Sequence, residues 1–93
     1  MKIQVKFFSG FRDKAGTAVT NIDATDVGDL LTKLGEQNES LRGTLLKETD
    51  SGLEIRSGVT VMLGGRNVLF LDGLDTELED GDTVAIFPPV GGG

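Results

Sequence analysis

The chain ends in a stretch, FPPVGGG (residues 87–93), in which two rigid prolines precede the least constrained of residues. Glycine loses more conformational entropy on ordering than any other residue, and chain ends are poorly ordered unless they are anchored. Such a segment adds nothing to a hydrophobic core. The chemistry that it offers is that of the Gly93 carboxylate, carried by Gly91 and Gly92, whose missing Cβ atoms allow entry to a narrow channel.

The composition excludes most other chemistry. The 93 residues include no cysteine and no histidine. This excludes disulfides, thiolate nucleophiles, serine–histidine hydrolysis, the usual zinc sites and the commonest general base near neutral pH. A carboxylate, an amine or the chain terminus must therefore do whatever chemistry takes place.

Charge and hydropathy exclude two classes of partner. The net charge is −6, with nine Lys and Arg among fifteen Asp and Glu, and there is no Trp or Tyr. Nucleic-acid binding needs clustered cations and stacking aromatics, so no nucleic-acid partner is expected. No apolar run approaches the roughly 20 residues that span a bilayer, and the start, MKIQVKFF, is not a signal peptide. We expect a cytoplasmic protein with no membrane partner.

The elements that must position the tail begin with two strands. Residues 2–8 alternate between apolar and polar, which predicts a half-buried strand, and residues 18–23 predict a second one. Between them, residues 10–17 (GFRDKAGT) lack the spacing of a phosphate-binding loop and predict a loop with one helical turn.

A helix follows, capped by Thr25 or Asp26. Its apolar positions have the three-and-four spacing of one buried face: Val27, Leu30, Leu31 and Leu34. We expect a second, shorter helix over residues 38–46 and a polar, turn-like stretch over residues 47–58.

The remaining chain predicts strands. Residues 59–71 read as two strands joined by a turn at Gly64 and Gly65, and the last strand runs from Thr83 to Phe87. Pro88 cannot donate to a ladder, so the sheet ends there. The expected fold is α+β: a mixed sheet in which the first and last strands are central neighbours and one main helix packs across one face.

The acidic stretch before the last strand is a candidate calcium site. Its members are Asp72, Asp75, Glu77, Glu79, Asp80 and Asp82. The alternation of an EF-hand loop is missing, however, and the aspartates adjoin glycines as turn-forming residues do. We therefore expect solvated turns and no metal site.

A better candidate for binding lies on the sheet. Strand parity directs Phe8, Met62 and Phe87 away from the helix, on strands that we expect to be close together. Single exposed apolar residues are common, but three beside the root of the tail predict a partner-binding patch, in which Phe and Met are typical.

The tail itself predicts a projecting arm. In polyproline geometry the six residues Pro88, Pro89, Val90, Gly91, Gly92 and Gly93 would reach about 18 Å. Ordering three glycines on docking costs about 3–6 kcal/mol, which contacts of the patch at Phe87 would have to offset. A cloning linker or simple fraying is the alternative reading of this segment.

The element order and the segment LEDGDTVAIFPPVGGG (residues 78–93) resemble the ubiquitin-like β-grasp sulfur carriers and modifiers. The likeness is greatest to the small subunit of molybdopterin synthase and the small archaeal modifier proteins. It departs from them at Gly91, where the family usually has alanine or serine. The resemblance implies a β-grasp domain over residues 1–87 and a flexible, extended diglycine tail over residues 88–93.

The resemblance also implies a mechanism. A ubiquitin-activating-type enzyme, which supplies ATP and Mg²⁺, would convert the Gly93 carboxylate to an acyl-adenylate. The chain would bind no cofactor and would be a recycled subunit or substrate of its partner enzymes.

Two fates of the acyl-adenylate are then open. Sulfur transfer would give a thiocarboxylate for molybdopterin or tungsten-pterin synthesis with a molybdopterin synthase large subunit. Alternatively, a lysine of a target protein would form an isopeptide bond with Gly93, and one protein could serve both uses. A third alternative is a non-covalent tethering module with an inert tail.

Overall fold

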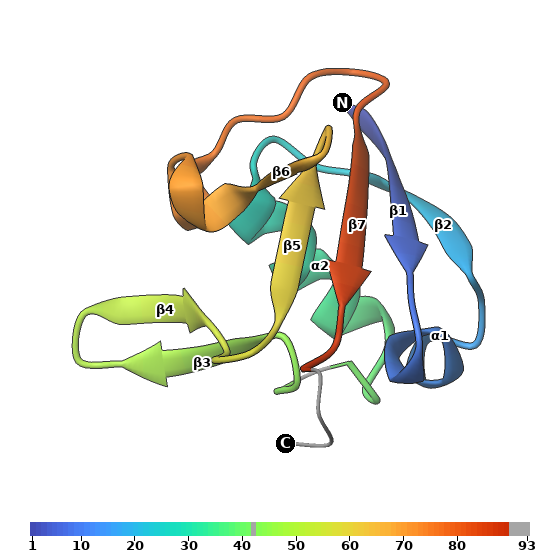
Figure 1. Cartoon of the computed structure of the whole chain (residues 1–93), viewed down its shortest axis with the longest axis horizontal. Coiled ribbons are helices and arrows are strands. Elements are labelled where there is room, and N and C mark those ends of the chain that lie inside the picture. The colour runs from blue at the N-terminus through green and yellow to red at the C-terminus, as the bar shows by residue number, and fades with distance from the viewer. Residues whose placement is uncertain (42, 90–93) are drawn as a thin grey trace.

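The computed structural model describes residues 1–41 and 43–89. Its main layer is a five-stranded sheet with the order β2-β1-β7-β5-β6 (Figure 1). The strands are β1 (Lys2–Phe7), β2 (Val19–Asp23), β5 (Thr60–Leu63), β6 (Arg66–Asn67) and β7 (Thr83–Phe87).

The first and last strands lie side by side at the centre of this sheet, as the sequence predicts. β1 and β7 are parallel, with Val5 opposite Val84 and Phe7 opposite Ile86. β1 also pairs with β2, and β7 with β5, in antiparallel ladders. The chain therefore leaves β7 at the same end of the sheet at which it leaves β1.

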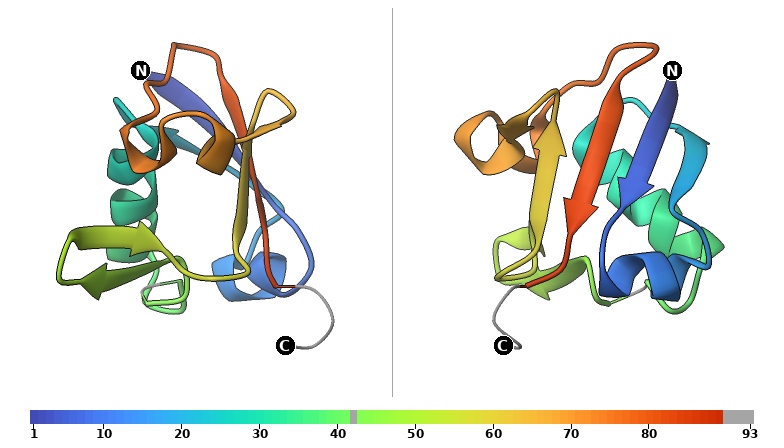
Figure 2. Two further views of the ribbon diagram at one scale, coloured as in Figure 1. Left: turned by 60° about the vertical axis from the view of Figure 1, so that its left-hand side comes forward. Right: turned by 45° about the vertical axis from the view of Figure 1, so that its right-hand side comes forward.

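The main helix, α2 (Val27–Gln37), covers one face of the sheet and leaves the other face uncovered by it (Figure 2). Its four predicted apolar positions are all buried. Asp26 is the N-cap, because its side chain accepts a hydrogen bond of 2.7 Å from the amide of Asp29. The predicted α+β arrangement of a mixed sheet and one main helix is thus confirmed.

The core lies between α2 and the sheet. Ile3, Val5, Val84 and Ile86 of the two central strands and Leu30 of the helix are fully buried. These strand residues alternate with exposed or half-buried ones, so that one face of β1 and β7 is buried and the other is available for contacts.

The predicted helical turn after β1 is present as α1 (Gly10–Ala15), which buries Phe11. It ends at Gly16, whose φ of 77° is the left-handed conformation common at helix ends.

The prediction of a helix over residues 38–46 is wrong. Described residues of this stretch form turns: the amide of Thr44 donates to the carbonyl of Leu41, and Gly43 has a φ of 81° that ends helical geometry. Leu41 and Leu45 have helical spacing and are buried, but they reach the core from a turn.

The turn-like stretch predicted for residues 47–58 is also incorrect. It is largely an antiparallel hairpin of β3 (Leu46–Thr49) and β4 (Gly52–Ile55), which forms a separate two-stranded sheet. Most of its residues are exposed or half-buried, so the alternation that identifies a strand is missing.

The second strand of residues 59–71 is shorter than predicted. β6 has two residues and is followed by the 3₁₀ turns η1 (Val68–Phe70) and η2 (Gly73–Asp75). Leu69 and Phe70 are 61% and 86% exposed on η1 rather than paired in the sheet. Among the described residues, no helix is both long enough and apolar enough to cross a bilayer.

One carboxylate at the start of α2 should make stability depend on pH. The amide of Thr25 donates to Asp29 over 3.1 Å, and this bond, followed by the Lys33 ammonium 3.2 Å away, holds the pKa of Asp29 below its ordinary value of 3.8. A lowered pKa in the folded state means stabilisation that is full above the unfolded pKa and is lost as pH falls through the folded one.

We expect Asp29→Asn to lower the free energy of unfolding by up to about 1 kcal/mol at neutral pH, with the difference lost at an acidic pH below the lowered pKa of Asp29 in the folded state. Urea unfolding at both pH values measures it. Asp13→Asn, which removes an exposed charge from α1, controls for net charge. A deficit of the same size at both pH values would show that the carboxylate charge is not responsible.

Candidate functional site

The site is built around the end of β7, on the sheet face that α2 does not cover. Phe8 follows β1 and Phe87 ends β7, and both side chains are half-buried. Their rings stack, with centroids 4.4 Å apart and planes 13° apart. The amide of Phe8 donates to the carbonyl of Ile86, which extends the parallel ladder and holds the two rings side by side.

Met62 joins them from the neighbouring strand. In the β5–β7 ladder Met62 lies opposite Ala85, and Thr60 lies opposite Phe87. Met62 and Phe87 are therefore diagonal neighbours on one face, within reach of long side chains. The structure thus brings together the three residues expected on this face, Phe8, Met62 and Phe87, which we call the outer-face patch.

Ala85 and Lys6 are further members of this face. Ala85 lies between Met62 of β5 and Lys6 of β1, because it is paired with both. The small side chain of Ala85 leaves the centre of the face flat, and the exposed ammonium of Lys6 adds a positive charge at its border. The alternation of side chains along each strand places both residues on this face, although neither is a large apolar residue.

The root of the tail lies at the same end of β7. Pro88 is half-buried, and Pro89 lies against Gly58, which the sequence did not single out. The other tail residues of interest, Val90, Gly91, Gly92 and Gly93, lie outside the described residues.

The acidic stretch forms turns at the opposite end of β7. The amide of Lys2 donates to Asp80 over 2.6 Å, and the amide of Glu79 donates to Asp82 over 2.8 Å. These carboxylates therefore serve as acceptors for backbone groups. Within residues 1–41 and 43–89, no cluster of three or more acidic side chains has the geometry to hold a metal ion.

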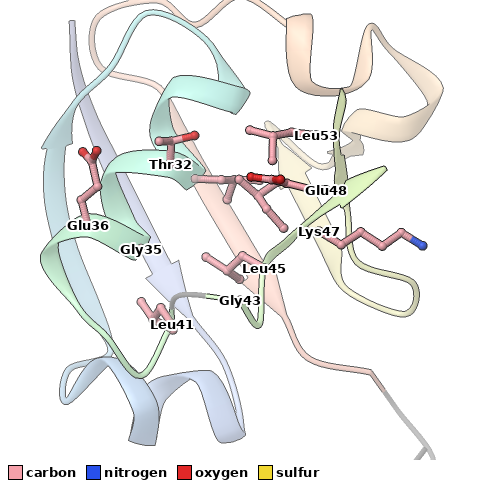
Figure 3. Close-up of a pocket in the computed structure, with 11 residues that line it drawn as sticks. Thr32, Gly35, Glu36, Leu41, Gly43, Leu45, Lys47, Glu48 and Leu53 are labelled. Carbon is pink, nitrogen blue, oxygen red and sulfur yellow. The ribbon is translucent and has the colours of Figure 1, made fainter. Parts of the chain in front are cut away.

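A separate hollow of about 370 Å³ lies between α2 and the β3–β4 hairpin (Figure 3). Leu45 and Leu53 point into it, whereas the ammonium of Lys47 points away. Leu45 belongs to the core and Leu53 is 46% exposed. The hollow is mostly apolar, and its shape suits a contact with another apolar surface.

The fold is a β-grasp, and its central strand β7 ends at Phe87, which stacks on Phe8 and is followed in the sequence by two prolines, a valine and three glycines. These features together are those of a ubiquitin-like protein. The ThiS family model matches residues 5–93, so the chain belongs to the ThiS family. The predicted resemblance to the ubiquitin-like sulfur carriers is confirmed.

Individual relatives agree with this assignment. The chain is 39% identical to small archaeal modifier protein 3 of Haloferax volcanii over 97 aligned residues, which span 100% of both chains. It is similar to the solution structure of small archaeal modifier protein 1 from Methanosarcina acetivorans, with a TM-score of 0.89 and 30% identity over 99% of this chain and 96% of that one. A putative molybdopterin converting factor subunit 1 from Pyrococcus furiosus has a TM-score of 0.75 and 30% identity, over 97% and 99%.

Proposed function

We propose that the chain is a ubiquitin-like carrier whose Gly93 carboxylate is activated as an acyl-adenylate. One carboxylate oxygen attacks the α-phosphate of ATP, and pyrophosphate leaves. A ubiquitin-activating-type enzyme supplies the ATP, the Mg²⁺ and the catalytic groups. This chain supplies the carboxylate, a narrow tail and a face by which the enzyme holds it.

The observation that carries the proposal is the extent of the family match, which runs through the diglycine to Gly93. A domain that served only as a tether would need its sheet and not this terminal segment. The absence of histidine and cysteine from the sequence agrees with this, because it leaves carboxylates, amines and the chain terminus as the groups that could react.

Sulfur transfer is the first proposed use of the adenylate. A sulfur donor at the oxidation level of sulfide attacks the carbonyl carbon of Gly93, the bond to the AMP oxygen breaks, and a thiocarboxylate remains. The similarity to a molybdopterin converting factor subunit favours a pterin precursor as acceptor, with a molybdopterin synthase large subunit as partner. With no internal cysteine, the chain has no thiol to intercept the sulfur.

Protein modification is the second candidate, favoured by the similarity to two small archaeal modifier proteins. Here the amine of a target lysine attacks the same carbonyl carbon, AMP leaves, and the nitrogen loses a proton as the isopeptide bond forms. Both uses share the activation step, so one protein can serve both. We place this ATP-dependent chemistry in the cytoplasm.

The experiment that tests the proposal is pyrophosphate exchange. The chain, the ubiquitin-activating-type enzyme of the same host, ATP, Mg²⁺ and labelled pyrophosphate are combined. We expect label to enter ATP only when both proteins are present, because acyl-adenylate formation is reversible. No exchange above that of the enzyme alone, at saturating chain, would contradict the proposal.

The outer-face patch is the surface that we expect the activating enzyme to contact. Truncating Phe87 to alanine removes one ring of the stacked pair beside the tail. We expect Phe87→Ala to weaken binding by more than about 1 kcal/mol, as a central aromatic contact does. Titration of the enzyme with each variant measures the change in Kd.

The chain offers a matched control for this substitution. Phe70→Ala removes an identical side chain that is 86% exposed on η1, away from the end of β7. It should leave the Kd unchanged. Equal affinities of the wild type and Phe87→Ala for the enzyme would show that the enzyme does not bind through the outer-face patch.

A further inference from the structure

Pro89, the last described residue, rests against the turn that joins β4 to β5. A Cβ placed on Gly58 would lie 3.0 Å from both Cβ and Cγ of Pro89 and 3.6 Å from its Cα. Real Cβ atoms essentially never approach other atoms more closely than this. A side chain at residue 58 would therefore press against the proline ring, which would have to move by a few tenths of an ångström.

The turn also requires glycine for its own conformation. The amide of Val59 donates to the carbonyl of Arg56 over 3.1 Å, which closes a four-residue turn with Gly58 in the third position. Its φ is 88°, the value that type II turns need there and that L side chains rarely adopt. The same property of glycine thus shapes the turn and makes room for Pro89.

Both ends of this turn are fixed to the body. The amide of Arg56 donates to the carbonyl of Leu45 over 2.9 Å, and Val59 is 5% exposed in the core. Pro88 and Pro89 line a hollow of about 330 Å³ together with Val59 and the buried Phe11 of α1. Pro88 is half-buried and Pro89, although exposed, contacts the turn at Gly58, so both prolines lie beside an anchored surface.

We propose that Gly58 is a positioning residue, and that the turn of residues 56–59 is a seat for Pro89 that sets where the tail leaves the body. Proline has its φ fixed near −65°, so holding its ring also directs the chain that follows. The consequence for activation rests on the proposed function. A tail already aimed for entry into the enzyme needs less ordering when it binds.

A second glycine of the same chain provides a close control. Gly81 is the third residue of a turn closed by the amide of Asp82 and the carbonyl of Glu79, and its φ is 91°. A Cβ there would meet nothing within 4 Å. Gly81→Ala therefore reproduces the backbone strain of Gly58→Ala without the collision with Pro89.

The test uses the absence of cysteine from the sequence. Cysteines introduced at Glu36 on α2 and at Gly91 carry spin labels, and electron paramagnetic resonance gives the distance distribution between them. We expect Gly58→Ala to shift or broaden this distribution and Gly81→Ala to leave it unchanged. In a Pro89→Gly background, Gly58→Ala should have no further effect, because the colliding ring is gone. Identical distance distributions for the wild type, Gly58→Ala and Gly81→Ala would show that Gly58 does not position Pro89.

Enzyme kinetics then test the role of Gly58 in activation. The chains used carry no spin label, and thermal melting first shows that each is folded. We expect Gly58→Ala to raise the KM for activation about tenfold relative to Gly81→Ala with little change in kcat, since the lost preorganisation is restored on binding. Equal KM values would overturn the positioning role. If neither the wild type nor any variant supports activation, the proposed function fails. The distances between the spin labels still show whether the turn of residues 56–59 holds Pro89.

Discussion

A chain with one alanine added after Gly93 is expected to fold normally and to lose activation. The new carboxylate is displaced by one residue, about 3.5 Å along an extended chain, and the added Cβ follows the glycines into the channel. Misplacement of a reacting group by about 1 Å can already cost 100-fold in rate, so we expect a loss of more than about 100-fold in kcat/KM for adenylation.

Pyrophosphate exchange at matched enzyme concentrations measures this loss. The control is the same alanine inserted between Asp50 and Ser51, in the exposed turn of the β3–β4 hairpin, which belongs to a separate sheet. That variant should be activated normally. Wild-type exchange by the extended chain would mean that Gly93 is not the point of reaction.

Ile86→Ala should produce the largest loss of stability among the substitutions considered. Ile86 is fully buried, lies opposite Phe7 on one side and Val61 on the other, and faces the core below α2. Removing its outer atoms leaves a cavity that well-packed strands close only in part. We expect the free energy of unfolding to fall by about 2–5 kcal/mol, measured by urea unfolding.

The adjacent residue gives a contrast within one strand. Phe87 is half-buried on the opposite face, so Phe87→Ala should destabilise less than Ile86→Ala while weakening enzyme binding more. Folded Ile86→Ala should bind with nearly the wild-type Kd. If the two substitutions affect stability and binding in the same proportion, the separation of a core face from a docking face is wrong.

The sequence predicted the elements that bury only one face, because such elements show a regular pattern of apolar residues. β1 and β7 each alternate regularly because one face packs under α2, and α2 has one apolar stripe. Strand parity was enough to place Phe8, Met62 and Phe87 on a common face. The prediction that the first and last strands are central neighbours is confirmed, and the fold adds that β1 and β7 are parallel.

Other features depend on contacts that the local pattern does not contain. The β3–β4 hairpin has few buried positions, so neither strand alternates, and Gly43 breaks a stretch whose leucines have helical spacing. The contact of Gly58 with Pro89 joins segments far apart in the sequence. The sequence placed Gly58 only at the end of a polar, turn-like stretch, and the fold shows that Pro89 lies beside it.

The central claim, that Gly93 is the reacting residue, is tested most directly by mass spectrometry of the protein from its own host. An N-terminally tagged chain is purified under denaturing conditions that preserve covalent adducts. We expect either replacement of one oxygen by sulfur at Gly93, which identifies a sulfur carrier, or branched peptides joining Gly93 to lysines of other proteins, which identify a modifier. A Gly93 carboxylate that stays unmodified when the host's activating enzyme is overproduced would contradict the account.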